Sequence, residues 1–229
     1  MHFKLEVTLI YARDEASYLY LKEIRDSEKI KLYPDFTNIF EGKIPPYWDE
    51  KLEVAIVPNV RMKDKRQDGA RYEFFLKRII EYLLKNGKQP FFLIHGGSED
   101  RMLAERINSM LSKNIPIVDE EDLYYIKGII SKSKGVIGSR YHSLVSALSS
   151  NVIAIGTGWS HKYYYLFKDY DFEIGLIDMS MDFEHVKKVL NILIEQNKDI
   201  IENLKRKNEI LREKTYAMFA LVKKEIGIL

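Results

Sequence analysis

Residues 135–158 read GVIGSRYHSLVSALSSNVIAIGTG, and this stretch decides the fold. Two short apolar runs, GVIGS and NVIAIGTG, predict strands. YHSLVSALSS between them predicts a helix, whose small residues allow close packing on a sheet. A strand, a helix and a second strand in this order predict two parallel strands joined by a crossover helix. The stretch is therefore typical of an α/β protein.

The same alternation extends over the rest of the chain. Apolar runs that predict strands are KLEVAIVPN, QPFFLIHGG, IPIVD and FEIGLID. Segments that predict helices are ARYEFFLKRIIEYLLKNG, SEDRMLAERINSMLSKN, EEDLYYIKGIISKS and a segment near 160–168. We expect Gly87 to follow the end of the first helix, Ser98 to cap the second, and RMKDKRQDG to be a polar loop. The sequence thus predicts an α/β fold with a Rossmann-like parallel sheet sandwiched by helices.

The chain divides into three sections by composition. Residues 1–40 predict a strand over VTLIYA (7–12), a helix over RDEASYLYLKEI and a strand over KIKLYPDF. Residues 41–51, EGKIPPYWDEK, hold two prolines among charged neighbours, which is typical of a linker. Residues 52–229 predict one domain that includes a long C-terminal helical tail over 183–229.

The tail carries an apolar stripe that predicts a helix packed back on the domain. The stripe consists of Val186, Val189, Leu190, Leu193 and Ile194. Dimerisation through the charged section 198–214 is the alternative, so a homo-oligomer stays open.

The amino-acid composition limits the classes of function that the chain can have. The chain has 229 residues, with 46% hydrophobic and 31% charged, as in an ordinary globular protein. A formal net charge of +2 gives no electrostatic case for nucleic acid as a partner. The absence of cysteine excludes disulfides, thiolate metal sites and cysteine nucleophiles, and fits the cytoplasmic location that we expect. No apolar run approaches the ~20 residues of a membrane span.

Polar residues follow four of the predicted strands, where ligands bind in open α/β sheets. These residues are Asn59 and Arg61 after the first strand; His95, Gly96 and Gly97 after the second; Ser139, Arg140, Tyr141 and His142 after the third; and Trp159, His161 and Lys162 after the fourth. A single such residue is equally well explained as a surface loop residue. Four strand ends together favour a shared ligand crevice.

Arg140 and His142 are the strongest candidates. An arginine offers a planar fork for carboxylate or phosphate, and a histidine two residues on can transfer protons near neutral pH. The start of a helix beside them also favours an anion. The alternative is structural: Arg140 would pair with a carboxylate and His142 would cap the helix. Lys162 also has two interpretations: it could bind a phosphate, or it could be a surface residue at the rim of the domain.

Other chemistries have little support in the sequence. No HExxH or GxSxG motif occurs, and HGGSED matches neither nucleotide-binding fingerprint. The acidic pair Glu99 and Asp100 is interpreted as helix-start charge. We therefore expect neither a metal nor a cofactor.

Four segments, in order, resemble the polysaccharide pyruvyl transferase family. The stretch GVIGSRYHSLVSALSSNVIAIGTGWSHKY resembles its strand, arginine-X-histidine helix start, strand and lysine. ARDEASYLYLKEI resembles its RDxxS segment, LYPDF its strand with Pro-Asp, and LIHGGSED its histidine segment ending in Glu-Asp. Together these segments span residues 7 to about 170, and the tail carries no motif of the family.

The resemblance implies a GT-B-like architecture of two Rossmann-like halves and transfer of the enolpyruvyl unit of phosphoenolpyruvate to a sugar. Residues 1–40 would then be the end of an N-terminal half, and 52–229 the C-terminal half. Arg140 and His142 match the donor-contacting arginine and histidine, and Arg13 matches the arginine of RDxxS. We expect His142 to deliver or shuttle the proton. The N-terminal half looks truncated, which leaves independent activity open.

The implied partners are phosphoenolpyruvate and a sugar or lipid-linked glycan acceptor, with peripheral membrane association left open. Two other classes remain. One is a glycosyltransferase that uses a nucleotide-sugar, in which Asp169 or Asp171 would hold the ribose. The other is an incomplete, non-catalytic half that binds glycan or nucleotide.

Overall fold

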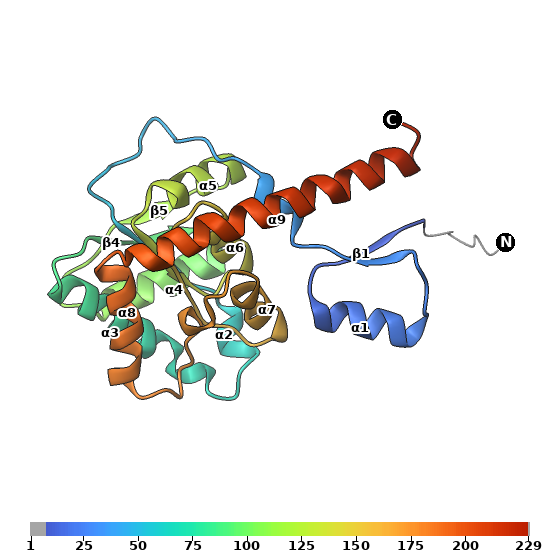
Figure 1. Cartoon of the computed structure of the whole chain (residues 1–229). Helices are drawn as coiled ribbons and strands as arrows, with labels where there is room; N and C mark the ends of the chain where they lie inside the picture. The colour runs from blue at the N-terminus through green and yellow to red at the C-terminus, as the bar shows by residue number, and fades with distance from the viewer. Residues whose placement is uncertain (1–7, 229) are drawn as a thin grey trace.

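The computed structural model describes residues 8–228, which form two parts that lie side by side (Figure 1). The larger part is a five-stranded sheet flanked by helices, and the smaller part is a two-stranded sheet with one helix. Residues 1–7 and Leu229 lie outside this description, so the predicted start of the first strand at Val7 is not covered.

The large sheet is parallel throughout, in the order β5–β4–β3–β6–β7. Its strands are β3 (Val54–Val57), β4 (Pro90–Ile94), β5 (Ile117–Asp119), β6 (Gly135–Gly138) and β7 (Ala154–Gly156). β3, β4 and β6 bury every residue, as expected of strands covered on both faces. The chain runs outward from β3 to β5 and then returns to β6, so the topological switch point, where ligands bind, lies between β3 and β6.

The helices alternate with these strands as the sequence predicts. They are α2 (Arg61–Asp64), α3 (Tyr72–Lys85), α4 (Ser98–Ser109), α5 (Leu123–Lys132), α6 (Tyr141–Ser149), α7 (His161–Asp169), α8 (Phe183–Ile194) and α9 (Lys198–Glu225). Three 3-10 turns, η1 (Phe36–Ile39), η2 (Gly69–Arg71) and η3 (Glu173–Gly175), connect them. Gly87 follows the end of α3 with φ +71°, a conformation that glycine adopts without strain, and this confirms its predicted place.

Three local predictions are wrong. FEIGLID forms the 3-10 turn η3 instead of a strand, and only Leu176 makes an isolated parallel bridge, to Gly156. The polar loop RMKDKRQDG contains the short helix α2. The cap of α4 is Gly97, with φ +89°, and Ser98 is the first helical residue. In the last case the left-handed backbone of the loop, which suits glycine, outweighs the preference of serine for the cap.

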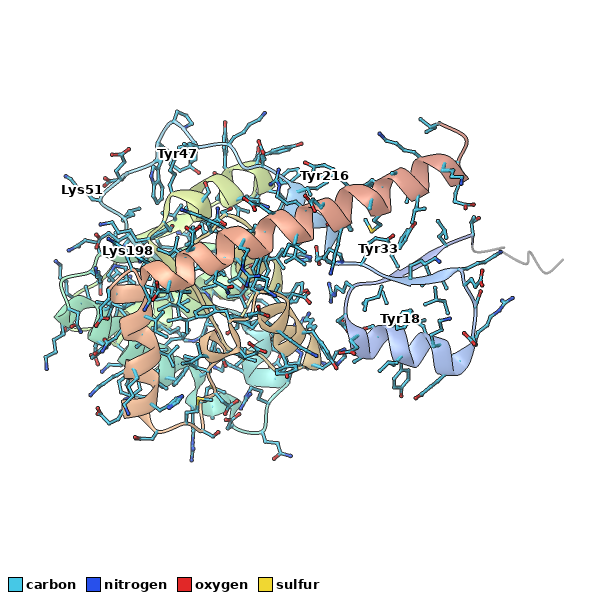
Figure 2. All side chains as sticks on the ribbon, viewed as in Figure 1. Tyr18, Tyr33, Tyr47, Lys51, Lys198 and Tyr216 are labelled. Carbon is cyan, nitrogen blue, oxygen red and sulfur yellow. The ribbon has the colours of Figure 1, made fainter. Side chains whose placement is uncertain are left out.

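Residues 41–51 form no helix or strand and run along the outside of α5 (Figure 2), where Tyr47 and Lys51 are labelled. The backbone of Lys43 donates a hydrogen bond to the carbonyl oxygen of Tyr124 at 2.8 Å. Gly128 permits this approach, because a Cβ there would lie 1.8 Å from the carbonyl oxygen of Lys43. The segment thus follows a defined path between the two parts.

The C-terminal tail packs back on the domain, as predicted. α8 buries four of the five stripe residues, Val186, Val189, Leu190 and Leu193. α9 then crosses the domain and extends beyond it to the smaller part (Figure 1). Along α9 the hydroxyl group of Thr215 donates a hydrogen bond to Asn38 Oδ1 of η1 at 2.9 Å. Within residues 8–228, α9 and the other helices all lack the length or the apolar character of a membrane span.

The smaller part consists of β1 (Ile10–Ala12), α1 (Glu15–Ile24) and β2 (Ile30–Leu32), with β1 and β2 parallel. Asp14 begins α1 as its N-cap, since its carboxylate accepts the backbone N–H of Ser17 at 2.8 Å. α1 buries none of its residues. Figure 2 shows Tyr18 on this helix and Tyr33 directly after β2.

Candidate functional site

The carboxyl ends of β3, β4, β6 and β7 meet at one edge of the sheet because the strands are parallel. The four predicted groups of polar residues therefore lie on neighbouring loops. The structure separates them into a buried layer at the switch point and an open layer that faces the smaller part.

Ser139 is the centre of the buried layer. Its carbonyl oxygen accepts hydrogen bonds from Asn59 Nδ2 at 3.0 Å and from the Tyr163 hydroxyl group at 2.9 Å. Its own hydroxyl lies 2.8 Å from that of Tyr72. Asn59 and Ser139 are both buried, so these two predicted site residues brace the loop between β6 and α6. Arg61 lies on the surface and pairs with Asp64 at 3.1 Å.

Arg140 is held in place by a buried carboxylate. Its Nε donates to Asp100 Oδ2 at 2.7 Å, and its Nη2 lies 2.5 Å from the same oxygen. The other oxygen of Asp100 accepts the backbone N–H of Val60 at 2.9 Å. Glycine is required at position 96, because a Cβ there would meet both Asp100 and Arg140 within 2.3 Å. One edge of the guanidinium is thus occupied, and within residues 8–228 Nη1 has no hydrogen bond or ion pair.

His95 is a neutral neighbour of Arg140. Burial, together with the positive charges of Arg140 and His142, lowers the pKa of its imidazole to about 4. Its Nε2 lies 2.5 Å from the hydroxyl oxygen of Ser143 on α6. At neutral pH His95 therefore acts as a hydrogen-bonding group and carries no charge.

The open layer is built around the ring of Tyr141. The Arg13 guanidinium lies 4.4 Å from the centre of this ring, which is a cation–π distance. Arg13 Nη1 and His142 Nε2 both approach Asp35 Oδ2, at 3.5 and 3.8 Å. Two residues 129 positions apart thus converge on one carboxylate. The side chain of His142 keeps 62% of its surface exposed, so it is accessible to a ligand.

Lys162 brings a second cation to the same ring. Its ammonium lies 5.1 Å from the centre of the Tyr141 ring and 5.8 Å from that of Trp159. Burial lowers the pKa of Lys162, and the charge of Arg13 lowers it further. Burial also raises the pKa of Tyr141, so its hydroxyl stays protonated at neutral pH. Two cations that share one aromatic ring make a site suited to an anion.

His161 lies at the edge of this layer, with Nε2 3.6 Å from Asp14 Oδ1. The loop that carries Trp159 is tied to the larger domain by Arg66, whose Nη1 donates to the carbonyl oxygen of Gly158 at 3.1 Å. Arg66 also pairs with Asp178 at 2.8 Å. Among the described residues, no cluster of three or more histidines and carboxylates could hold a metal ion.

The carboxylates that organise the site cannot be recognised from the local sequence. Asp100 was interpreted as a helix-start charge, yet it is 1% exposed and holds Arg140. Asp35 was noted only as part of LYPDF, yet it faces both Arg13 and His142. Asp100 had only the signal of its position, since the third residue of a helix that follows a strand lies at the sheet edge. Asp35 had no local signal, because only the packing of η1, which Asp35 caps, brings it to α6.

The strand order, the helices on both faces of the sheet and the crossing helix α9 define a Rossmann-like α/β domain. The model of the polysaccharide pyruvyl transferase family matches residues 2–161, more than half of the chain. The chain therefore belongs to the polysaccharide pyruvyl transferase family. No curated protein matches the sequence significantly.

Solved structures agree on the fold. S. aureus MnaA with UDP is 11% identical, with a TM-score of 0.65 over 97% of this chain and 61% of that one. The UDP-GlcNAc 2-epimerase from Neisseria meningitidis, bound to UDP-GlcNAc, is 11% identical, with a TM-score of 0.57 over 95% and 61%. A variant of S. aureus TarM in complex with UDP is 17% identical, with 0.57 over 93% and 43%. This chain thus spans between 43% and 61% of the length of these structures.

Proposed function

We propose that this chain transfers the enolpyruvyl unit of phosphoenolpyruvate to a sugar of a surface polysaccharide or its precursor, with a pyruvate ketal as product. One observation carries the proposal: Arg13 and Lys162 flank the ring of Tyr141 beside the exposed His142. Membership of the pyruvyl transferase family supports it at the level of polysaccharide modification.

The donor is small and strongly anionic, and the open layer supplies what its recognition needs. Arg13 offers a planar fork for its carboxylate or phosphate, and Lys162 offers a point charge. The free Nη1 edge of Arg140 adds a third cationic group. The backbone N–H groups of Tyr141 and His142 begin α6 and have no partner within residues 8–228, so they add the positive end of a helix.

The reaction balances without a metal or a cofactor. A first sugar hydroxyl adds through its oxygen to C2 of the enol, and a proton goes to C3 to form the methyl group. A second hydroxyl then forms its bond to C2 while the bond from C2 to the phosphate oxygen breaks. Of the two hydroxyl protons, one ends on C3 and the other leaves with the phosphate. In our proposal His142 carries these protons, with Asp35 nearby to orient its ring.

The division of the chain follows from the same proposal. Residues 1–40 are the end of an N-terminal half, 41–51 the linker and 52–229 the C-terminal half.

A second candidate is a glycosyltransferase that uses a nucleotide-sugar. The observation in its favour is that structures with the same fold hold UDP or UDP-GlcNAc. Thermal-shift titration separates the two. A ligand at 100 times its dissociation constant stabilises by ~2.7 kcal/mol, and we expect this from phosphoenolpyruvate. Stabilisation by UDP alone would move the assignment to a glycosyltransferase, and no response to either would favour a non-catalytic half.

The role of His142 is tested by phosphate release from phosphoenolpyruvate with a panel of glycan acceptors. We expect His142→Ala to lose ~100-fold or more in rate at saturating donor, as for loss of a general acid–base group. His185→Ala on α8 is the matched control, because His185 is also exposed and lies outside the site. Full activity of His142→Ala would remove it from the mechanism.

A further inference from the structure

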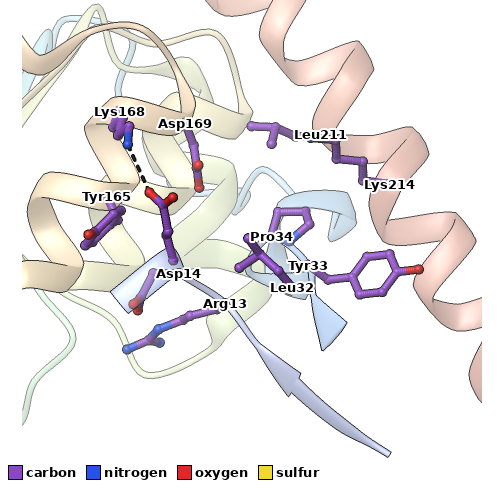
Figure 3. A pocket seen from close by; sticks show the side chains of 11 residues that line it. Arg13, Asp14, Leu32, Tyr33, Pro34, Tyr165, Lys168, Asp169, Leu211 and Lys214 are labelled. Carbon is purple, nitrogen blue, oxygen red and sulfur yellow. Dashed lines mark hydrogen bonds and ion pairs between the residues drawn. The ribbon is translucent and has the colours of Figure 1, made fainter. Parts of the chain in front are cut away.

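A cavity of about 490 Å³ lies between the two parts of the molecule (Figure 3). Its walls come from the ends of β1 and β2 and from α7 and α9. The volume falls within the range of small-ligand pockets, roughly 300–1,000 Å³. None of the residues proposed above for donor recognition lines it, except Arg13.

The charges that line the cavity cancel. Its cations are Arg13, Lys168 and Lys214, and its carboxylates are Asp14, Glu15 and Asp169. Lys168 and Glu15 neutralise each other directly, with Nζ 3.1 Å from Oε2, as the dashed line in Figure 3 shows. A balanced wall gives no net attraction to a strongly anionic donor or to a nucleoside diphosphate. It suits an uncharged, polar ligand.

Asp169 is the least satisfied group in the wall. Its carboxylate points into the cavity, and within residues 8–228 it has neither a hydrogen bond nor an ion pair, while neighbouring Asp171 pairs with Lys207 at 2.6 Å. Burial raises the pKa of Asp169 to about 6, against the lowering effect of Lys214 and Lys207. At neutral pH it is therefore a half-buried carboxylate that needs hydrogen-bond donors. Lys214, on the opposite wall, is a donor without a carboxylate partner in the described chain.

The remaining wall supplies flat aromatic surface. Tyr33 and Tyr165 line the cavity, each partly buried. An aromatic face packs against the C–H groups of a sugar ring, while carboxylates and ammonium groups bind its hydroxyls. Proteins bind a sugar ring through hydrogen-bond acceptors, hydrogen-bond donors and aromatic faces. This cavity offers all three.

The cavity also connects to the candidate site. Arg13 lines it and stacks on Tyr141, and Asp14 lines it and lies 3.6 Å from His161. A sugar bound in the cavity could therefore extend a hydroxyl group toward the donor beside His142.

We propose that this cavity binds an uncharged sugar residue of the acceptor glycan, with Asp169 and Lys214 holding its hydroxyls and Tyr33 and Tyr165 its ring. The assignment as an acceptor subsite rests on the proposed pyruvyl transfer. The binding of a neutral sugar can be tested independently of it.

The test is binding of methyl glycosides of galactose, glucose, mannose and N-acetylglucosamine to the full chain, by saturation-transfer NMR and titration. Methyl glucuronide and UDP serve as anionic counterparts. We expect at least one neutral glycoside to bind, and Asp169→Asn to weaken it about tenfold, the effect of losing a hydrogen bond to a charged group. Asp171→Asn, the same change two residues away and outside the cavity, should leave the affinity within about twofold.

Lys214→Gln is the second variant and should weaken the same glycoside in the same direction, so that a folding defect in one variant does not decide the result. Equal binding to the wild type and both variants, or no binding of any neutral glycoside, would overturn the proposal. Binding of UDP that depends on Asp169 would also overturn it and assign the cavity to a nucleotide. If glycosides depend on Asp169 while phosphoenolpyruvate fails to stabilise the chain, the sugar subsite stands and the pyruvyl function fails.

Discussion

The two parts of this molecule each carry half of the candidate site, and they differ in how deeply their elements are buried. In the larger domain β3 and β4 bury every residue, and α6 with Arg140 and His142 packs on that core. In the smaller part α1 buries none, and Leu19 and Ile24 are 54% and 75% exposed. The half of the site on the larger domain is therefore positioned by a hydrophobic core. The position of the other half depends on the contacts between the smaller part and the larger domain.

Polar and aromatic contacts hold the smaller part and the η1 turn that follows it against the larger domain. Lys127 on α5 donates to the carbonyl oxygen of Thr37 at 3.0 Å, and burial lowers its pKa to about 8. Thr215 on α9 bonds Asn38, and Arg13 stacks on Tyr141. Segments with few buried apolar contacts open locally at low free-energy cost. We expect Arg13, directly after β1, to be more mobile than His142, and its approach to the donor would complete the site.

The largest difference between the two parts should appear in core substitutions. Phe92→Ala removes a fully buried ring of β4 and should lower the free energy of unfolding by about 3–5 kcal/mol. Leu19→Ala on α1 should change it by less than about 0.5 kcal/mol, because that side chain is already exposed. Urea unfolding measures both. A loss of several kcal/mol for Leu19→Ala would mean that the smaller part has a core of its own.

His95 should make the stability of the larger domain depend on pH. Its pKa in the folded state is about 4, below the usual 6.5, because of burial and the charges of Arg140 and His142. Its contribution is therefore fully present above about pH 6.5 and is lost as the pH falls toward 4, up to about 3 kcal/mol. His95→Gln should lose less stability than the wild type between pH 7 and pH 4. Identical slopes would show that His95 is solvated, and His185→Gln is the exposed control.

Asp100→Asn tests the clamp on Arg140. Loss of the buried carboxylate leaves the guanidinium without its partner and should cost about 2 kcal/mol in unfolding free energy. The neighbouring exposed Glu99→Gln should stay within about 0.5 kcal/mol. If the two variants behaved alike, Arg140 would not depend on Asp100, and its orientation would have to come from elsewhere in the loop.

Arg13→Lys should give the smallest change in stability and affect mainly the donor. Lysine keeps the charge but loses the planar fork and its stacking on Tyr141, so affinity for phosphoenolpyruvate should fall about tenfold. The free energy of unfolding should move by less than about 0.5 kcal/mol, since Arg13 is partly exposed. Unchanged affinity of Arg13→Lys for phosphoenolpyruvate would show that Arg13 does not bind the donor and that only residues of the larger domain do.

Much of the fold could be predicted from the sequence, because hydrophobic period and length identify buried strands and the helices between them. FEIGLID was predicted wrongly because an apolar run is also compatible with packing as a turn. Phe172 in that run is buried against Phe167, with ring centres 6.1 Å apart. The partner in this tertiary contact lies outside the run, so the local residues alone do not identify the turn.

For the site, the sequence by itself determined which residue types stand at the strand ends, including Arg140 and His142 beside the start of a helix. Strand polarity alone brings those loops to one edge, so their nearness needed no tertiary information. The partners were decided only by the tertiary structure: Asp100 for Arg140, Asp35 for Arg13 and His142, and Tyr141 as the shared ring. These contacts join residues 21 to 128 positions apart, and local sequence patterns carry no record of such pairings.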